Sequence, residues 1–425
     1  MDYVGGFNPS TGQTAFGKPA LDALVNADPG VTEGSVLAME AVKHPIEEIL
    51  YCIEQRGLTP DKDDRTQLWQ ALSVGQIEFI TANTTITVGS DPSDDQPTLQ
   101  DALDYLADKL IAPGALVTLS MRAETHTYSA DVVFDRPDVE RIRIVGAALT
   151  GSFPAHGDFS LVGGTTAPVY SGAQRAADNA LNDTMVRSRF ATTINFTAGA
   201  LRFPNGMQSL SNVLIDGAVG HDGLVITGGK CNLSNVAILG GENGLVTVLT
   251  SITGSNVVMS GQAAEGLSQK ASYLELAGVV RVQGATGNGV SANFGANLTV
   301  SSTDPFQSRG NGGHGVALGW SSSAHIPGAQ VDRNTQNGLW VIGNSSCYAD
   351  SSMVVHNGEN GAIASNGSFI DMGLANATSN NYVGAAHYGV QAVHGGHIYA
   401  AGIAGGTTFS PSVNTIGTTG GFISI

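Results

Sequence analysis

The sequence has little of what several protein classes require. Its three cysteines, Cys52, Cys231 and Cys347, lie far apart, which gives neither a disulfide framework nor the ligand spacing of a metal site. Charged residues make up only 13% of the 425 residues, and 19 basic against 36 acidic side chains leave a net charge of −17. Because a nucleic-acid groove needs a basic stripe, this balance argues against nucleic acid as a partner.

Long apolar runs are also missing. No window holds the ~18 apolar residues that a membrane span requires. The first six residues have neither a basic start nor an apolar core, so we expect no signal peptide. Glycine is abundant, at 56 residues, and β-branched residues are plentiful. This composition favours a β-rich protein with small turn residues, assembled in a reducing cytoplasm.

What the sequence does contain is an internal repeat between about residues 212 and 393. A polar residue, most often Asn, precedes a Gly, an apolar residue follows it, and successive glycines are 21 to 28 residues apart. A second pattern, Ser-Asn-Val, recurs at 211–213, 234–236 and 255–257. Two interleaved patterns with one period indicate a single repeated structural unit. The repeated glycines are Gly223, Gly244, Gly266, Gly289, Gly315, Gly338, Gly361 and Gly389.

Each repeat holds short β-rich runs, such as 213–215 and 224–226, separated by Gly, Asn, Ser and Asp. No helical period fits, which argues against a leucine-rich repeat. We predict an all-β fold, a right-handed parallel β-helix, in preference to a Gly-rich β-sandwich. The Asn-Gly pairs would supply turn residues that tolerate positive φ. Asn at one recurrent place would form a ladder of side-chain amides between coils.

Residues 1–80 differ from the repeats and predict a small helical region. One apolar face runs through 46–53 after Pro45, and a second stripe contains Leu68, Trp69 and Leu72. A helical hairpin this small buries little surface by itself, so we expect it to pack on a partner or on copies of itself.

Part of this region carries a resemblance. Gly57-Leu58-Thr59-Pro60 followed by Thr66-Gln67-Leu68-Trp69-Gln70-Ala71-Leu72 resembles a segment near the start of many bacteriophage tail fibre and tail spike proteins. There the segment lies in the part that joins the fibre to the tail. The resemblance implies that residues 1–80 attach to a phage tail or baseplate protein, with Leu68, Trp69 and Leu72 in the contact, and that the protein is located in the virion tail. An ordinary helical hairpin remains the alternative.

The next part of the chain predicts the start of the solenoid. Residues 81–97 are polar and read as a linker, and 98–108 form a helix that Thr98 is placed to cap. The order of this helix and a strand ending at Gly146 resembles the first coils of pectate-lyase-like β-helices in phage tail proteins, where a short helix caps the open end. We predict a β-helix over 98–400, with an irregular insertion at 147–190 that includes a short helix at 175–180.

The C-terminal stretch lacks charge. No Asp, Glu, Lys or Arg follows Asp371, so the end at 401–425 is uncharged. A long uncharged end is easier to explain if copies of the chain pack together there. The resemblance implies a parallel homotrimer.

Acidic residues raise the question of glycan cleavage. A glycosidase uses two carboxylates roughly 5–10 Å apart, and acids in equivalent positions on coils about 5 Å apart would meet this requirement. Asp222 and Glu265 share one register two repeats apart, and Glu242 lies beside the turn between them. These three are the catalytic candidates, with solvated turn acids as the alternative. No Asp-rich calcium signature is present, so we predict no metal and no cofactor.

Sugar binding needs less, namely exposed rings with polar neighbours. Alternation along the strand points Trp340 outward if Leu339 points inward, which makes Trp340 the first candidate. Ring packing or a subunit interface is the alternative. The rings in neighbouring repeats are Trp320, His325, Trp340, Tyr348 and His356.

Three functions follow from this sequence. The favoured one is a phage tail fibre or spike subunit that attaches to the host surface through a polysaccharide. The second is a depolymerase, hydrolase or lyase, on the same scaffold, and the third is a structural virion spacer with no receptor. The sequence favours the attachment protein over the enzyme.

Overall fold

The computed structural model describes residues 50–51, 78–159, 171–301, 305–378, 380, 388–403, 407–410, 417 and 419–425. Contacts divide the chain into two compact units, Met1–Phe79 with Ala107–Leu110, and Ile80–Leu106 with Ile111–Ile425. Strands β1 (Glu78–Ile80) and β3 (Lys109–Ile111) form a small sheet of their own. Leu68, Trp69 and Leu72 lie outside the described residues. Of the helices expected in 1–80, the structure describes only Leu50 and Tyr51, which are helical.

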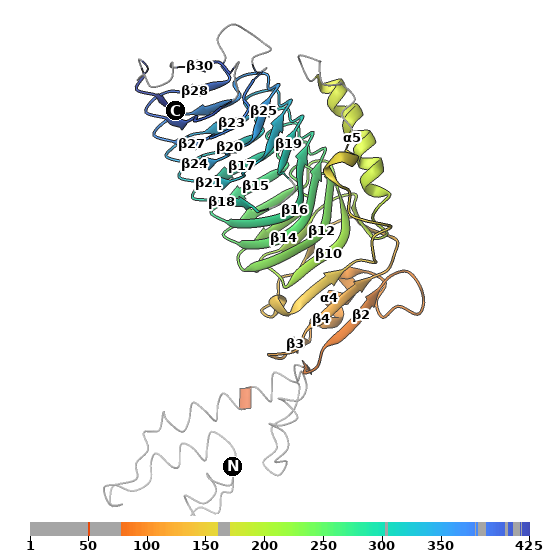
Figure 1. Ribbon diagram of the computed structural model, residues 1–425. Helices are drawn as coiled ribbons and strands as arrows, with labels where there is room; N and C mark the ends of the chain where they lie inside the picture. The colour runs from red at the N-terminus through yellow and green to blue at the C-terminus, as the bar shows by residue number, and fades with distance from the viewer. Residues whose placement is uncertain are drawn as a thin grey trace, which may run out of the picture. The chain divides into compact units, whose positions relative to one another are not determined.

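The second unit is a parallel β-solenoid of about 12 coils (Figure 1). Each coil passes over three faces in the order face 1, face 2, face 3. Strands pair in parallel with their equivalents in the coils before and after. The predicted all-β parallel solenoid is therefore confirmed.

The strands are assigned to faces by their pairing. Face 1 contains β2 (Thr84–Val88), β4 (Val117–Met121), β7 (Ile142–Val145), β18 (Asn297–Val300), β21 (Ser323–His325), β24 (Ser346–Tyr348), β27 (Phe369–Asp371), β29 (His397–Tyr399) and β31 (Phe422–Ser424). Face 2 contains β5 (Thr125–Tyr128), β8 (Thr193–Phe196), β19 (Gln307–Arg309), β22 (Gln330–Asp332) and β25 (Met353–Val355). Longer strands that bend from face 1 to face 2 are β10 (Ser209–Gly217), β12 (Lys230–Gly240), β14 (Ser251–Ser260) and β16 (Tyr273–Gln283). Face 3 contains β6 (Val132–Val133), β9 (Leu201–Phe203), β11 (Leu224–Thr227), β13 (Leu245–Val248), β15 (Leu267–Lys270), β17 (Val290–Asn293), β20 (Val316–Leu318), β23 (Leu339–Val341), β26 (Ala362–Ala364), β28 (Val390–Ala392) and β30 (Phe409–Ser410).

The first coil begins earlier than the sequence predicts. Residues 81–97, expected as a linker, contain β2, which pairs in register with β4 on face 1. The helix α4 (Leu99–Leu106) follows, and the Oγ1 of Thr98 accepts a hydrogen bond from the Asp101 N–H at 3.1 Å. Leu99 and Leu106 are fully buried in the solenoid core, which places α4 against the first coils (Figure 1).

The bend between faces 1 and 2 explains the Ser-Asn-Val pattern. Asn212, Asn235 and Asn256 have φ values of 56°, 53° and 58°, a left-handed conformation that Asn tolerates better than most residues. The Nδ2 of Asn235 donates to the Oδ1 of Asn212 at 2.9 Å, and the Nδ2 of Asn256 donates to the Oδ1 of Asn235 at 2.8 Å. The predicted Asn ladder is therefore present at this corner.

The repeated Gly has a different role from the one predicted. None of the eight repeated glycines is among the glycines with positive φ, so turn conformation is not the reason for them. A Cβ at Gly244, Gly266, Gly289, Gly315 or Gly338 would instead lie within 3.0 Å of the carbonyl oxygen of the equivalent glycine in the next coil. Glycine is needed here because the backbones of successive coils approach closely.

The insertion at 147–190 covers the outside of face 2. Its helix α5 (Gly172–Arg187) is longer than the helix expected at 175–180, and Ser171 caps it by accepting from the Gln174 N–H at 3.2 Å. Val186 and Phe190 pack against Leu214 and Val258 of face 2. Figure 1 shows α5 alongside the coils, away from β18, β21 and β24. No helix in the described residues is long and apolar enough to cross a membrane.

Candidate functional site

The predicted catalytic acids belong to a ladder of polar side chains. Asn243 lies between two of them, because its Nδ2 donates to Asp222 Oδ1 at 2.8 Å and its Oδ1 accepts from the Glu265 N–H at 3.1 Å. Asn288 continues the ladder by donating to Glu265 Oε1 at 3.2 Å. Asp222 and Glu265 are thus two coils apart in one column, as predicted, but both accept hydrogen bonds from ladder amides. Glu242 precedes Asn243, and its carboxylate has no described contact with either acid.

Glu265 is the most perturbed of these acids. Burial raises its pKa to about 7, although hydrogen bonds from Asn288 act in the opposite direction. Its Oε1 accepts from Asn288, whereas its buried Oε2 has no hydrogen-bond partner among the described residues. A carboxyl group with this pKa exchanges protons near neutrality, which is the property that a general acid requires.

Trp340 points outward on face 3, as alternation predicts, because Leu339 and Val341 on either side are buried. Its ring stacks on His314, with centroids 4.6 Å apart and planes at 23°. His314 is a member of the polar ladder, and its Nδ1 accepts from the Asn337 N–H at 3.2 Å. Burial lowers the pKa of His314 to about 4, so the imidazole is neutral at pH 7. Trp340 is therefore partly covered by its own neighbours.

The other predicted rings lie elsewhere on the solenoid. His356 follows β25 at the end of face 2, with a φ of 58°, and Trp320 occupies the corner between faces 3 and 1, with a φ of 54°. Tyr348 and His325 lie on face 1, at paired positions of β24 and β21. The five predicted rings thus spread over different faces and do not form one site.

Face 1 gathers a different set of rings around Tyr348. Its ring centroid lies 6.4 Å from that of His325 and 6.0 Å from that of Phe369. The row continues from Phe369 to His397 at 5.5 Å and from His397 to Phe422 at 5.2 Å. We call these five residues, His325, Tyr348, Phe369, His397 and Phe422, the ring row. All five point out of the solenoid, because the residues at the centres of their strands are buried.

Sequence reasoning missed three members of the ring row. The residues Ser323, Ser346 and Phe369 recur at a 23-residue spacing, each followed by a buried residue and then an outward one. This spacing placed Phe369 on the same face as Tyr348 and would have revealed it. His397 and Phe422 fall outside the constant spacing, so their register needed the strand pairing.

An open hollow lies at one end of the ring row. It has a volume of about 390 Å³ and is lined by Asn297, Ser323, Ala324, His325 and Tyr348. The accessible surface of this lining is almost entirely apolar, with the Tyr348 and His325 rings on it. Asn297 Nδ2 donates to Ser323 Oγ at 2.7 Å, which fixes both polar groups.

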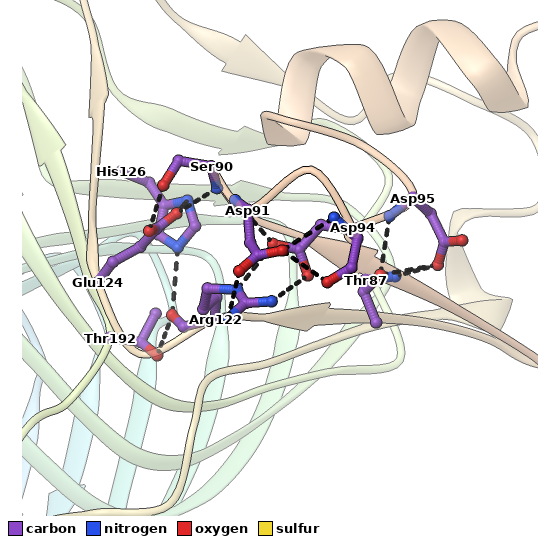
Figure 2. Close-up of polar contacts among 10 residues, drawn as sticks. Thr87, Ser90, Asp91, Asp94, Asp95, Arg122, Glu124, His126 and Thr192 are labelled. Carbon is purple, nitrogen blue, oxygen red and sulfur yellow. Dashed lines mark hydrogen bonds and ion pairs between the residues drawn. The ribbon is translucent and has the colours of Figure 1, made fainter.

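A second polar cluster lies on the first coils (Figure 2). Arg122 holds Asp94 through two hydrogen bonds of 2.7 and 3.1 Å, and Glu124 accepts from the N–H and hydroxyl of Ser90, both at 2.7 Å. The backbone N–H of Thr87 donates to Asp95 and lowers the pKa of that carboxyl. Because each of these carboxylates is engaged by a neighbour, the cluster ties the loop before α4 to the coils, and we assign it no chemistry.

No group of three or more His, Cys, Asp or Glu side chains among the described residues could hold a metal ion. Cys231 and Cys347 are buried separately in the core, and burial raises the pKa of both thiols. Neither thiol is placed to act as a nucleophile.

The contact between α5 and face 2 contains a half-buried carboxyl group that makes stability depend on pH. Burial raises the pKa of Asp183 to about 6, against the effect of a 2.8 Å hydrogen bond from Ser260 Oγ. A folded-state pKa above the usual value of 3.8 means that this group contributes stability below about pH 4 and loses it as the pH rises to 6. The loss is about 3 kcal/mol at most.

We therefore expect Asp183→Asn to be more stable than the wild type at pH 7.5 and to approach it at pH 4. Denaturant unfolding of both proteins at the two pH values measures the difference. An equal difference at both pH values would show that the asparagine acts through packing and that the ionisation of Asp183 is not the cause.

Comparisons with known proteins leave the family open. No protein family model matches the sequence, and no curated protein matches it. Similar solved structures include two A-modules of mannuronan C-5 epimerases from Azotobacter vinelandii. AlgE4 is 14% identical with a TM-score of 0.47 over 77% of this chain and 93% of that chain. AlgE6 is 15% identical with a TM-score of 0.37 over 78% and 94%. Likeness at this level carries no functional assignment.

Proposed function

We propose that this chain is a subunit of a phage tail fibre or tail spike whose solenoid attaches the virion to a carbohydrate on the host surface. The tail role is supported by the resemblance of residues 57–72, which lie outside the described residues. The uncharged stretch after Asp371 supports a homotrimer. Residues 1–80 then join the fibre to a tail or baseplate protein.

The ring row and its hollow carry the carbohydrate part of the proposal. Sugars present flat apolar faces and many hydroxyls, so a site for them combines aromatic surfaces with hydrogen-bonding groups. Tyr348 is 44% exposed on face 1, and the hollow beside it presents a mainly apolar surface, with the polar groups of Asn297, Ser323 and His325 at its edge. A rigid solenoid holds such groups at the regular spacing of its coils, about 4.8 Å. A glycan chain lying across several coils would meet a ring or a polar group on each.

Truncating the central ring tests this site. We expect Tyr348→Ala to weaken binding to a purified bacterial surface polysaccharide about tenfold, since one well-placed aromatic contact contributes this much. Tyr105→Ala is the matched control, because Tyr105 is 45% exposed and lies on α4. Isothermal titration gives the affinities, and circular dichroism checks that both variants fold. If both variants bind with the affinity of the wild type, the binding site does not lie at Tyr348 on face 1.

A depolymerase on the same solenoid is the second candidate, and Glu265 favours it. Its carboxyl has a pKa of about 7 and a buried oxygen without a described partner, and Asp222 lies two coils away in the same column. At about 4.8 Å per coil, the two acids are about 10 Å apart along the solenoid axis. That spacing is near the upper limit for an inverting glycosidase.

Sizing of the polysaccharide after incubation separates the two candidates. Intact glycan that co-elutes with the protein supports attachment, and shortened chains support the depolymerase. In the latter case we expect Glu265→Gln to lower cleavage at least about a hundredfold, as for loss of a general acid. Glu359→Gln is the control, because Glu359 accepts from the ladder residue Asn337 at 2.8 Å in a distant coil. If the protein neither binds nor cleaves the polysaccharide, a structural spacer is the function that remains.

A further inference from the structure

A column of exposed residues runs along the corner between faces 3 and 1. Leu249, Ala271, Phe294 and Trp320 occupy equivalent positions in successive coils, and we call them the corner ridge. Their φ values are 52°, 46°, 60° and 54°, so all four are in the left-handed region. Leu249, Phe294 and Trp320 are 70%, 60% and 62% exposed.

The residues of the corner ridge lower the stability of the fold in two ways. A bulky residue in the left-handed region is strained, and glycine or asparagine would relieve the strain. Large apolar side chains that stay in water also do not contribute the free energy that their burial would add to folding. At other corners of the same solenoid, positions with positive φ hold residues that tolerate it with less strain, such as Asn235 and Gly261. Strain of this kind tends to persist where function requires it.

The upper part of the ridge borders the hollow on face 1. Phe294 and Trp320 each precede a lining residue, Asn297 and Ser323, by three positions. Three residues span at most about 10 Å, so the backbone of Phe294 and Trp320 lies within that distance of two residues that line the hollow. Their planes are within 5° of parallel, with centroids 6.4 Å apart. Tyr348 and His325 line the hollow on face 1, and Phe294 and Trp320 lie at the corner that leads to its lining residues Asn297 and Ser323.

The charge of this surface limits the ligand. Strands β18, β21, β24, β27, β29 and β31 contain no Lys or Arg, and Asp371 is their one carboxylate. A polyanionic glycan would therefore meet no cation on these strands and one like charge. Beside them, exposed Lys270 pairs with Asn293 and Glu275 pairs with Thr299, so one charge of each sign flanks this surface. The whole chain, with a net charge of −17, adds to the repulsion at longer range.

We propose that Phe294 and Trp320, with the hollow beside them, form a stacking platform for a neutral glycan. Sugars that carry carboxylate, sulfate or phosphate groups are disfavoured at this surface. The inference rests on the proposed attachment function and adds to it the class of glycan and the residues that select it.

A microarray of bacterial surface glycans that includes neutral and acidic members tests the ligand class at pH 8, where histidine is ordinarily neutral. We expect binding to neutral members, with an affinity that changes little between 50 and 300 mM NaCl. Binding to acidic members that is lost after chemical reduction of their carboxyl groups would overturn the inference and leave attachment intact. Binding to no member would overturn the attachment function itself.

The corner ridge supplies a matched pair of variants for the strongest neutral hit. We expect Trp320→Gly to weaken binding about tenfold, the loss of one good aromatic contact. Leu249→Gly removes an equally exposed and equally strained residue two coils before Asn297, and we expect it to leave affinity unchanged. Both variants should keep or raise the melting temperature because glycine relieves the strained φ. Equal affinity of the two variants would overturn the role of the ridge.

Discussion

Gly338→Ala is expected to destabilise the solenoid by about 3 kcal/mol or more, although it adds a single methyl group. The new Cβ would lie 2.6 Å from the carbonyl oxygen of Gly361 in the next coil and 2.5 Å from Cγ1 of Val354. It would also lie 2.7 Å from Nδ2 of Asn357, which is fully buried. Asn357 is itself held by a 3.0 Å hydrogen bond from Asn334 Nδ2 in the preceding coil. The Gly361 carbonyl and this buried amide therefore cannot both move without separating the coils. Denaturant unfolding measures the loss.

Gly157→Ala is the control for this prediction. Its Cβ would have no neighbour within 4 Å, and Gly157 is not among the glycines with positive φ. We expect the control to change stability by less than about 0.5 kcal/mol. A similar small change for Gly338→Ala would mean that the coils separate more easily than their contacts indicate, and that close approach is not what requires glycine at this position.

The period of the repeat was enough to predict the architecture but not the reason for each residue. Polar-Gly-apolar triplets with one period indicate stacked coils, since only equivalent positions in a solenoid share an environment. The Asn ladder also followed from the sequence, because an amide both donates and accepts. The role of the repeated Gly did not, because close approach of two backbones and positive φ select the same residue. Only the coordinates separate these two requirements.

The sequence predicts only part of the candidate site, for a related reason. The sequence predicts Tyr348 and His325 as candidate rings, but the face on which a ring lies depends on strand register and on where each corner turns. Trp340 pairs with Ala317 and Ile363 on face 3, so it cannot join Tyr348 on face 1. The corner ridge was unpredictable from propensity, because Leu249, Phe294 and Trp320 are residues that ordinarily avoid positive φ.

Asn334→Leu is expected to cost about 4 kcal/mol, because it breaks a third ladder, which Asn311, Asn334 and Asn357 form inside the core. Asn334 is 1% exposed, and its Oδ1 accepts from both the backbone N–H and Nδ2 of Asn311, at 3.1 and 2.9 Å. Its Nδ2 donates to Asn357 Oδ1 at 3.0 Å and to the Ser308 carbonyl at 3.2 Å. Leucine has a similar volume but pairs with none of these groups. Each buried polar group that loses its partner costs roughly 1–3 kcal/mol.

Asn232→Ala separates the effect of burial from that of the amide itself. Asn232 also links two coils, since its Nδ2 donates to Thr253 Oγ1 at 3.0 Å, but it lies on the outside of β12 in contact with water. Water replaces the lost partner there, so we expect a cost below about 1 kcal/mol. In a solenoid each coil is stabilised mainly by its neighbours, so the Asn334 defect should also raise hydrogen exchange first in the coils around β22. Equal costs for the two variants would mean that coil stacking, rather than the buried ladder, holds this part of the solenoid together.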